Sequence, residues 1–517
     1  MGILPWRTPH AGRVFPYGPG VRPIVTEREV DDACVTAVLT PRSGLVRERA
    51  AADGFFELDE GPFTHYQRRV TVTPRGDGRH LVRQVIDADL AIPYFGWLFR
   101  GPYRGALARL EPDEGRAPWW APPDRLDAEA ATTLAALAVL SMVLGYATIL
   151  LSQTITFAAD QFGADKAAQG IGLAAIRFDL LLSFPLVALT DRRGRRGVLL
   201  TATAAACVVT ALGALTTSLP TLIATQVPAR GLLTATAVIV TIMAAEEMPA
   251  GARAYAVGLL TMAGAGGGGL AVLLLPVADT GDGGWRILFA IALFGLLPVA
   301  HLRRYLPESR RFRAPHARAR LTGHGRRLWL LAISALLLSA FFTPASYFVN
   351  EFLREDRGFS ATRISLFTVL TITPGAIGIV VGGRLADVRG RRGIGAIALV
   401  GGVATTVLMY VTIGWPLWAW STISSIVGAA TVPALGVYGP ELFPTALRGQ
   451  ANAIIGVVGR AGSVIGLLLV GFIASNHSFG TAMAAVAVGP IILAVLVITM
   501  YPETAHRSLE DLNPEDA

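Results

Sequence analysis

The sequence predicts an all-α polytopic membrane protein with twelve transmembrane helices in two six-helix halves, preceded by a small soluble α+β domain. The 517 residues are 52% hydrophobic and only 16% charged, and the mean hydropathy of +0.51 is too high for a soluble chain of this length. Apolar segments of about twenty residues, each able to cross ~30 Å of hydrocarbon as a helix, follow one another along most of the chain. Several charged motifs of the first half reappear in the second, as a duplicated architecture requires.

The basic character of the chain could indicate a nucleic-acid partner, since Lys and Arg outnumber Asp and Glu by 45 to 37. However, the arginines cluster between apolar runs, a pattern that indicates membrane topology, so we expect no nucleic acid as partner. Cys34 and Cys207 are too few and too far apart for a disulfide framework or a metal site. We expect no cofactor and no metal, and no constellation of nucleophile and base indicates an enzyme.

The first 128 residues mix polar and apolar side chains and contain no segment long enough to span a bilayer. Strand-like runs at 63–73 and 79–86 flank Arg75-Gly76-Asp77-Gly78, which predicts a β-hairpin. Residues 94–110 are aromatic, basic and amphipathic, and fit either a core helix of this domain or a helix on the membrane surface. In phrases such as DADLAIPYFGWLFRGPYRGALARL the extension resembles a SRPBCC-type helix-grip domain.

The expected units are the extension at 1–128, a first half at 129–310, a basic linker at 311–327, a second half at 328–507 and a tail at 508–517. The expected spans of the first half are 131–157, 170–189, 197–218, 222–245, 255–277 and 285–301. Those of the second half are 328–349, 364–385, 393–413, 417–438, 451–474 and 481–500.

Arginine also predicts the orientation, because short cytoplasmic loops of membrane proteins collect positive charge. The stretch 303–327 holds nine arginines and a single acid, Glu308, and further arginines follow the second and eighth spans. The loop 279–284 on the opposite side carries only acids. We therefore expect a multi-pass protein of the plasma membrane with both termini in the cytoplasm.

Three motifs occur twice at nearly the same separation. LTDRRGRRG, with Asp191, returns as LADVRGRRG, with Asp387, 196 residues later. EEMPAGAR, with Glu246, returns as ELFPTALR, with Glu441, 195 residues later, and LPES returns as YPET at the same separation. Two homologous six-helix halves, related as parallel repeats around a site at the membrane midplane, explain this register.

These motifs resemble those of the major facilitator superfamily. The pattern G-x-L-A-D-x-x-G-R-R is complete at 383–392, whereas its first copy has Val187 at the leading glycine. PELFPTALRG at 440–449 and the two P-E-S/T boxes narrow the resemblance to the sugar-porter and organic-ion or metabolite-symporter branches. The resemblance covers about residues 130–511, and it implies a secondary transporter that works by alternating access.

We interpret the paired charged motifs as a cytoplasmic gate, because carboxylates set among planar guanidinium groups can form bidentate ion pairs when the two halves approach. One exposed pair contributes only ~0 to 1 kcal/mol, but several partly buried pairs can bias a two-state equilibrium. The alternative is simple positive-inside anchoring. The gating candidates are Asp191, Arg192, Gly194, Arg195, Arg196, Glu246, Arg253, Gly383, Asp387, Gly390, Arg391, Arg392, Glu441 and Arg448.

Four charged residues lie many residues from either end of the expected spans, where charges are costly and normally face a cavity or a partner. Asp179 is the only carboxylate that we place deep in a span, and it is either a proton-coupling group or the partner of Arg230 or Arg460 in a structural salt bridge. Arg177 is two residues away, about 200° round the helix, so it cannot pair with Asp179. Arg230 loosely resembles the fourth-helix arginine of the superfamily, and Arg460 either takes part in transport or holds the halves together.

Further candidates for substrate or ion coupling are Tyr146, Gln153, Tyr347 and Asn350. Three intramembrane arginines with one acid favour a small organic anion as substrate. Its transport is either coupled to protons or facilitated without coupling. The alternatives are efflux of hydrophobic drugs and a membrane sensor that keeps a transporter fold. Besides this solute and protons, the lipid bilayer is the only expected partner, and we expect a monomer.

Overall fold

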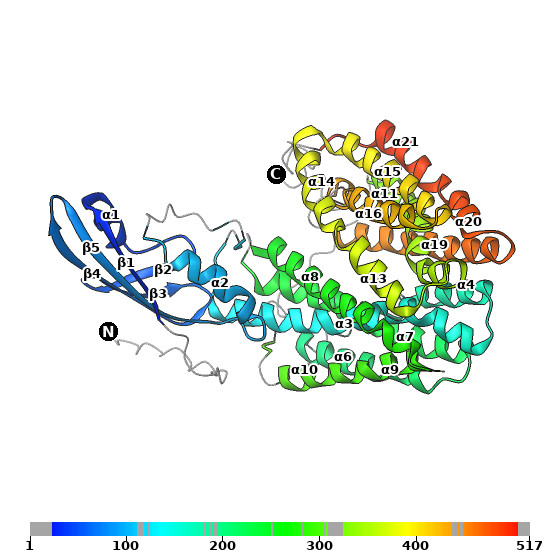
Figure 1. Ribbon diagram of the computed structural model, residues 1–517, viewed down its shortest axis with the longest axis horizontal. Helices are drawn as coiled ribbons and strands as arrows, with labels where there is room; N and C mark the ends of the chain where they lie inside the picture. Colours follow the sequence, from blue (N-terminus) through cyan, green and yellow to red (C-terminus); the bar gives the residue numbers. More distant parts are fainter. Residues whose placement is uncertain are drawn as a thin grey trace, which may run out of the picture.

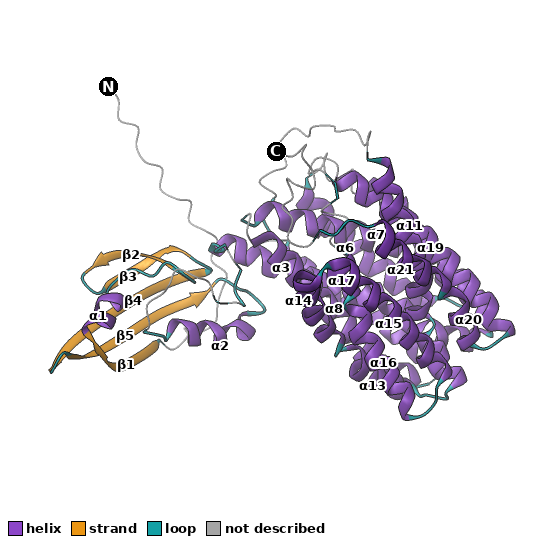
Figure 2. Cartoon of the chain, turned by 90° about the horizontal axis from the view of Figure 1, so that it is seen from above, coloured by secondary structure: helices purple, strands orange, loops and turns teal. Residues whose placement is uncertain are grey.

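The computed structural model describes residues 23–504 except 111–117, 119, 123, 180, 184, 187–188, 190–193, 250–251, 282, 304–305, 309–323, 437, 439–441 and 444–447. Within these limits the side chains of 245, 253–254, 380, 383–384, 387–388 and 448–450 are also outside the description. A sheet-containing extension lies at one end of a large helical bundle, and both views show it beside the beginning of α3 (Figures 1 and 2).

The extension folds around an antiparallel five-stranded sheet of order β1-β5-β4-β3-β2. Alternate residues of β5, namely Val82, Gln84 and Ile86, are fully buried, while the residues between them face outward. This period of two is what a sheet covered on one face requires. The elements are β1 (Ile24–Asp31), α1 (Asp32–Val38), β2 (Arg47–Ala52), β3 (Phe55–Glu60), β4 (Phe63–Gly76), β5 (Arg79–Leu90) and α2 (Gly96–Leu107).

The predicted hairpin is confirmed, because β4 and β5 pair in antiparallel register up to Gly76 and Arg79. Asp77 and Gly78 form the two-residue turn with φ of 53° and 70°, and two positive φ angles are what a type I′ turn needs. The backbone twist of such a turn matches the right-handed twist of the two strands, so the turn residues alone determine the register of this hairpin. The likeness of the extension to a SRPBCC-type domain stays a prediction.

A buried ion pair lies under the covered face of the sheet. The Arg68 guanidinium donates to the Glu48 carboxylate at 2.6 and 2.8 Å, and both side chains are almost fully buried. The Tyr66 hydroxyl donates to the same carboxylate at 2.5 Å, and burial raises the pKa of this phenol. Since every charge here is hydrogen-bonded, the pair ties β2 to β4 without leaving an unpaired buried charge.

The first helical half begins with α3, whose N-cap Asp127 accepts a hydrogen bond from the Ala130 amide at 2.7 Å. Gly163, with φ of 65°, ends this helix in the left-handed conformation. The helical segments of this half are α3 (Ala128–Phe162), α4 (Lys166–Ala175), η1 (Ile176–Phe178), α6 (Arg195–Ala211), η2 (Leu212–Leu215), α7 (Leu219–Glu247), α8 (Arg253–Leu273), η4 (Leu275–Asp279), α9 (Gly284–Ile291), η5 (Ala292–Gly295) and α10 (Leu296–Leu302).

The second half repeats this plan. Its segments are α11 (Gly325–Tyr347), α12 (Val349–Glu351), η6 (Phe352–Asp356), α13 (Ala361–Ile372), α14 (Gly375–Arg389), α15 (Arg391–Val411), α16 (Trp415–Ala429), α17 (Thr431–Leu435), α19 (Arg448–Asn476), α20 (Phe479–Val486) and α21 (Val488–Met500). In both halves the first helix packs backbone to backbone on the fifth. A Cβ added at Gly145 would overlap the Gly264 carbonyl, and one added at Gly462 would overlap that of Leu336.

Ten helical stretches of the described chain are long and apolar enough to cross a membrane, and they coincide with ten of the expected spans. Large apolar side chains such as Ile397, Phe472 and Leu297 are about two-thirds exposed on the bundle surface, where lipid would cover them. The expected spans 170–189 and 417–438 contain residues outside the description, so the count of twelve stays a prediction. The helical membrane fold and the preceding α+β domain are confirmed.

The extension packs directly on the first half. Ala91 is completely buried, and its carbonyl accepts a hydrogen bond from the Thr132 hydroxyl of α3 at 3.1 Å. The Tyr94 ring meets the His301 ring of α10 edge-on, with centroids 5.9 Å apart. The domain is thus joined to the bundle by side-chain packing as well as by the chain itself.

Candidate functional site

Charged residues from both halves meet in the interior of the bundle. Asp179, which follows η1, is 2% exposed. Its Oδ1 lies 3.3 Å from Nη1 of Arg460 on α19, and its Oδ2 lies 4.0 Å from Nε of Arg230 on α7. The Thr234 hydroxyl, one helical turn after Arg230, donates to Oδ2 at 2.7 Å. One carboxylate therefore contacts an arginine of each half.

Tyr347, at the end of α11, completes this group. Its hydroxyl accepts a hydrogen bond from Nη2 of Arg230 at 2.7 Å, and Nη1 of Arg230 donates to the Thr148 carbonyl of α3. The guanidinium of Arg177 lies over the Tyr347 ring, 4.5 Å from its centroid, a cation–π distance. We refer to this group as the central cluster, whose members are Arg177, Asp179, Arg230, Tyr347 and Arg460.

The central cluster carries more positive than negative charge. It combines three guanidinium groups with the single carboxylate of Asp179, whereas the other contacts of Arg230 are to neutral oxygens. Within the described residues the Nε of Arg177 is buried and has no hydrogen-bond partner. A cavity of about 10 Å³ beside Arg230 and Tyr347 has room for about one water molecule. The arrangement can attract an anion and offers it directed N–H donors.

Gln153 and Asn350 meet across the two halves, nearer one end of the bundle. The Asn350 amide donates to both the main-chain and side-chain oxygens of Gln153 at 3.0 Å. Tyr146 does not join them, because its hydroxyl donates at 2.7 Å to the Leu288 carbonyl inside the first half. Of the four expected polar candidates, only Tyr347 contacts the charged residues of the central cluster directly.

Ionic contacts join the halves at the same end as Asn350. Arg354 of η6 donates to Asp160 of α3 at 2.7 Å and to Asp279 of η4 at 3.3 Å. Lys166 of α4 pairs with Asp356 at 3.2 Å. We refer to these contacts as the interhalf latch, formed by Asp160, Lys166, Asp279, Arg354 and Asp356.

At the opposite end of the bundle, the described residues of each arginine motif form hydrogen bonds within their own half. The Glu308 carboxylate accepts from the amides of Arg195 and Arg196 at 2.7 and 3.0 Å. The Glu503 carboxylate accepts in the same way from Arg391 and Arg392 at 3.0 and 3.2 Å. An anion at a helix N-terminus satisfies free amides and complements the helix dipole. These two glutamates, which belong to the paired LPES and YPET boxes, therefore cap α6 and α15.

Among the other gating candidates, Glu246 forms an ion pair with Arg195 inside the first half, and Arg195 is 4% exposed. Arg196 and Arg392 donate to the Arg303 and Ile498 carbonyls, also within one half. Gly383 lies in α14. Asp191, Arg192 and Glu441 lie outside the described residues, as do the side chains of Arg253, Asp387 and Arg448. The gate itself stays a prediction.

Gly194 and Gly390 leave room for the capping carboxylates. Their φ angles are +86° and +98°, and an added Cβ would lie 2.8 and 2.9 Å from an oxygen of Glu308 and Glu503. We expect Gly194→Ala and Gly390→Ala each to destabilise the protein by about 1 to 2 kcal/mol through strain in the left-handed region alone. The thermal midpoint of the purified protein measures this effect.

Gly197→Ala and Gly393→Ala are the matched controls, because these glycines lie three residues further along the same helices and an added Cβ would meet nothing within 4 Å. We expect the controls to be neutral or slightly stabilising. Equal midpoints for all four variants would contradict the requirement for glycine at positions 194 and 390.

Sequence reasoning missed several residues of this site. Thr148 and Thr234 carry no charge, and only the folded chain shows that they contact the central cluster. Glu351 corrects our expectation that Asp179 is the only carboxylate deep in a span, because it is 3% exposed in a helical stretch that continues to Asp356. The expected seventh span stopped at residue 349, since charged residues follow it.

Two similar helical halves, whose long apolar helices can cross a membrane and which hold a charged cluster between them, define the class of parallel-repeat transporter folds. The chain belongs to the Major Facilitator Superfamily, whose sequence profile matches residues 135–349 and 328–516. This confirms the family that the motifs indicated.

Curated relatives match over part of the chain. A Haemophilus influenzae protein named for metabolite transport is 30% identical over 166 residues, which are 31% of this chain and 40% of that protein. The cis,cis-muconate transport protein of Acinetobacter baylyi is 23% identical over 239 residues, 43% of this chain and 58% of that protein. The matches thus span 40% and 58% of the length of these relatives.

Solved structures match over most of the bundle. The xylose transporter XylE from E. coli in an inward open conformation superposes with a TM-score of 0.62 at 17% identity, covering 75% of this chain and 99% of that one. An inward-facing bacterial homologue of the human lysosomal transporter Spinster gives 0.60 at 16% identity, covering 74% and 97%. At these identities the likeness concerns the fold alone.

Proposed function

We propose that this protein is a secondary transporter that moves a small organic anion across the plasma membrane by alternating access. The central cluster is the observation that carries this proposal. It combines three arginines with a single carboxylate, and Arg230 and Arg460, which both contact that carboxylate, come from different halves. A bound carboxylate would balance the excess charge and would contact both halves at once.

The energetic reason is the cost of intramembrane charge. A central arginine costs about 2.5 to 3.5 kcal/mol on insertion scales, so it needs a partner or a polar cavity. Asp179 can neutralise only one of the three guanidinium groups, and the neutral oxygens around Arg230 accept hydrogen bonds without cancelling charge. An apolar drug would leave this charge unbalanced. The cluster therefore favours an organic anion over hydrophobic efflux.

The two ends of the bundle support alternating access. The interhalf latch closes one end, while the ionic contacts of the described residues at the arginine-motif end stay within each half. If the latch opens, the capped arginine motifs can approach across the halves and act as the expected gate. The two arrangements would expose the central cluster to opposite sides in turn.

The named relatives agree with this substrate class. The Acinetobacter relative is named for cis,cis-muconate, a dicarboxylate. Binding of a dicarboxylate would suit a site with at least two unneutralised guanidinium groups. Coupling to protons through Asp179 belongs to the same proposal.

Transport assays on the purified protein in proteoliposomes test the proposal. We expect a carboxylate such as cis,cis-muconate to enter and to be competed by other carboxylates, whereas xylose should neither enter nor compete. Empty liposomes give the background. Uptake of apolar dyes without uptake of carboxylates would favour drug efflux, and saturable binding without uptake would favour a sensor. Either result would overturn the proposed function.

The proposed orientation places the extension and both termini in the cytoplasm and the latch outside. We expect Thr280→Cys, in the exposed acidic loop after η4, to react with a membrane-impermeant maleimide in intact cells. Native Cys34 in the extension, which is partly exposed, should react only after permeabilisation. Labelling of Cys34 in intact cells with no labelling at position 280 would reverse the topology.

A further inference from the structure

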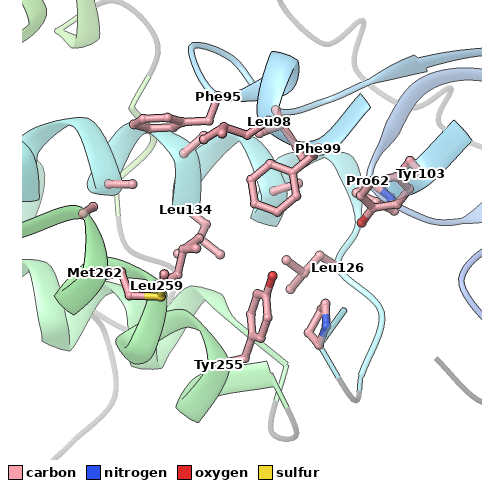
Figure 3. A pocket seen from close by; sticks show the side chains of 16 residues that line it. Pro62, Phe95, Leu98, Phe99, Tyr103, Leu126, Leu134, Tyr255, Leu259 and Met262 are labelled. Atoms are coloured by element: carbon pink, nitrogen blue, oxygen red, sulfur yellow. The ribbon is translucent and has the colours of Figure 1, made fainter. Parts of the chain in front are cut away.

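A cavity of about 380 Å³ separates the extension from the first half. Phe95, Leu98 and Phe99 close it on the α2 side, and Leu134 of α3 with Leu259 of α8 forms the opposite wall (Figure 3). The volume lies within the range of about 300 to 1,000 Å³ that small-molecule pockets occupy. None of the residues of the central cluster lines this cavity, so it is separate from the proposed transport site.

The side chains that line the cavity are chemically suited to a hydrocarbon ligand. All sixteen lining residues are apolar or aromatic, and only Tyr103 and Tyr255 bring a polar side-chain group. Among the described residues no charged side chain lines the cavity, so an anion such as the proposed substrate would find no charged partner in these walls. An occupant that is apolar over its buried length gains most from these walls.

One wall continues onto the surface that faces lipid. Met262, at the edge of the cavity, is 71% exposed on α8, within a stretch apolar enough to span the membrane. On the α2 side, Leu98 lines the cavity and is 51% exposed, and its neighbour Trp97 is 69% exposed. Tryptophan beside apolar residues is typical of the membrane–water interface.

Positive charge lies on the same helix. Arg100 and Arg104 are exposed at three and seven residues from Trp97, which places all three on one face of α2. On a helix at the membrane surface, basic residues of the polar face attract anionic lipid headgroups at the cytoplasmic leaflet, while the apolar face lies against the acyl chains. The sequence left open whether residues 94–110 form a core helix of the extension or a helix on the membrane surface. One side of α2 belongs to the core, since Tyr103 and Leu107 are buried in the extension, and the exposed side has the composition of a membrane-surface helix.

We propose that this cavity holds an acyl chain of an anionic membrane phospholipid, with the headgroup beside Arg100 and Arg104. The chain enters past Met262 and lies between α2 and the wall formed by α3 and α8. The lipid then belongs to the contact between the extension and the first half, and its binding stabilises that contact by mass action. This inference does not depend on the transported solute.

Photo-crosslinking of the full-length protein in liposomes tests the site. The probe is phosphatidylglycerol with a diazirine on one acyl chain, and digestion followed by mass spectrometry locates the adducts. We expect adducts in 95–103 and in 255–263. Ala263→Phe, which fills the cavity from α8, should lower the α2 adducts by about ten-fold, because packed interiors have no spare volume for the chain.

Ala265→Phe is the matched control, because Ala265 lies two residues further along α8, is exposed and does not line the cavity. It should leave the α2 adducts unchanged. Leu98→Trp, at a half-exposed position of the opposite wall, gives a second means of filling the cavity if Ala263→Phe does not fold. The double variant Arg100→Gln, Arg104→Gln should reduce labelling by phosphatidylglycerol but not by the same chain on phosphatidylcholine.

Two outcomes would overturn the proposal. One is equal α2 labelling in the Ala263, Leu98 and Ala265 variants, which would mean that the chain touches only the outer surface. The other is labelling of α2 by a water-soluble diazirine fatty acid but not by either bilayer phospholipid, which would assign the cavity to a soluble apolar ligand.

Discussion

Replacement of Asp179 by Asn is expected to abolish pH-driven accumulation of substrate while sparing exchange of substrate across the membrane. The Asn side chain keeps the size of Asp and can still accept a hydrogen bond from Thr234, but it cannot bind and release a proton. Exchange needs the central cluster and the movement of the halves, whereas uphill accumulation also needs net proton movement. Counterflow and pH-jump uptake in the same proteoliposomes separate the two activities.

Glu351→Gln is the comparison for this experiment, because Glu351 is the other strongly buried carboxylate that we find in the described helices. It should retain accumulation if Asp179 alone couples protons. A purely structural role of Asp179 predicts a different result. The variant would then lose stability by up to about 3 to 5 kcal/mol, because Arg230 and the partly exposed Arg460 would lose their counter-charge. Neutralising Arg460 as well would restore part of that stability, since Arg230 would still lack its counter-charge.

Normal abundance of Asp179→Asn together with normal accumulation would remove this residue from the mechanism.

Arg230→Gln is expected to weaken substrate binding by about 2 to 4 kcal/mol, or ~30- to 1,000-fold, the cost of losing one charged partner of a desolvated anion. Arg230 is 13% exposed and reaches α3, α11 and Asp179 from α7, so its guanidinium lies where both halves meet. Arg230→Lys should also be impaired, because an ammonium group cannot donate in the fixed fork that reaches Thr148 and Tyr347 together. The measurement is the concentration dependence of uptake and of competition.

Arg286→Gln is the matched control, since Arg286 of α9 is also an arginine of the first half but donates to the Ala214 and Thr216 carbonyls, away from the central cluster. We expect its apparent affinity for substrate to stay normal. Equal loss in the Arg230 and Arg286 variants would show that general damage to the first half, rather than lost anion binding, explains the effect.

The sequence by itself determined the fold class and most of the span positions. A run of about twenty apolar residues can satisfy its backbone in lipid only as a helix, so hydropathy alone decides where such segments lie. The hairpin at Gly76 and Gly78 was equally local, because its turn chemistry lies within four residues. The paired motifs predicted two homologous halves for the same reason, since a repeat is visible in the chain without knowing any contact.

Only the tertiary structure decided how the charges are partnered. Helical geometry showed that Arg177 and Asp179 point apart. It could not decide whether Arg230 or Arg460 is the partner of Asp179, because these arginines lie 51 and 281 residues further along the chain. The fold brings the Asp179 carboxylate within 4.0 Å of both. Glu308 and Glu503 cap α6 and α15 through backbone amides, which have no sequence signature. The cavity between α2, α3 and α8 likewise comes from three segments that packing alone brings together, because apolar contact is not directional and leaves no motif to read.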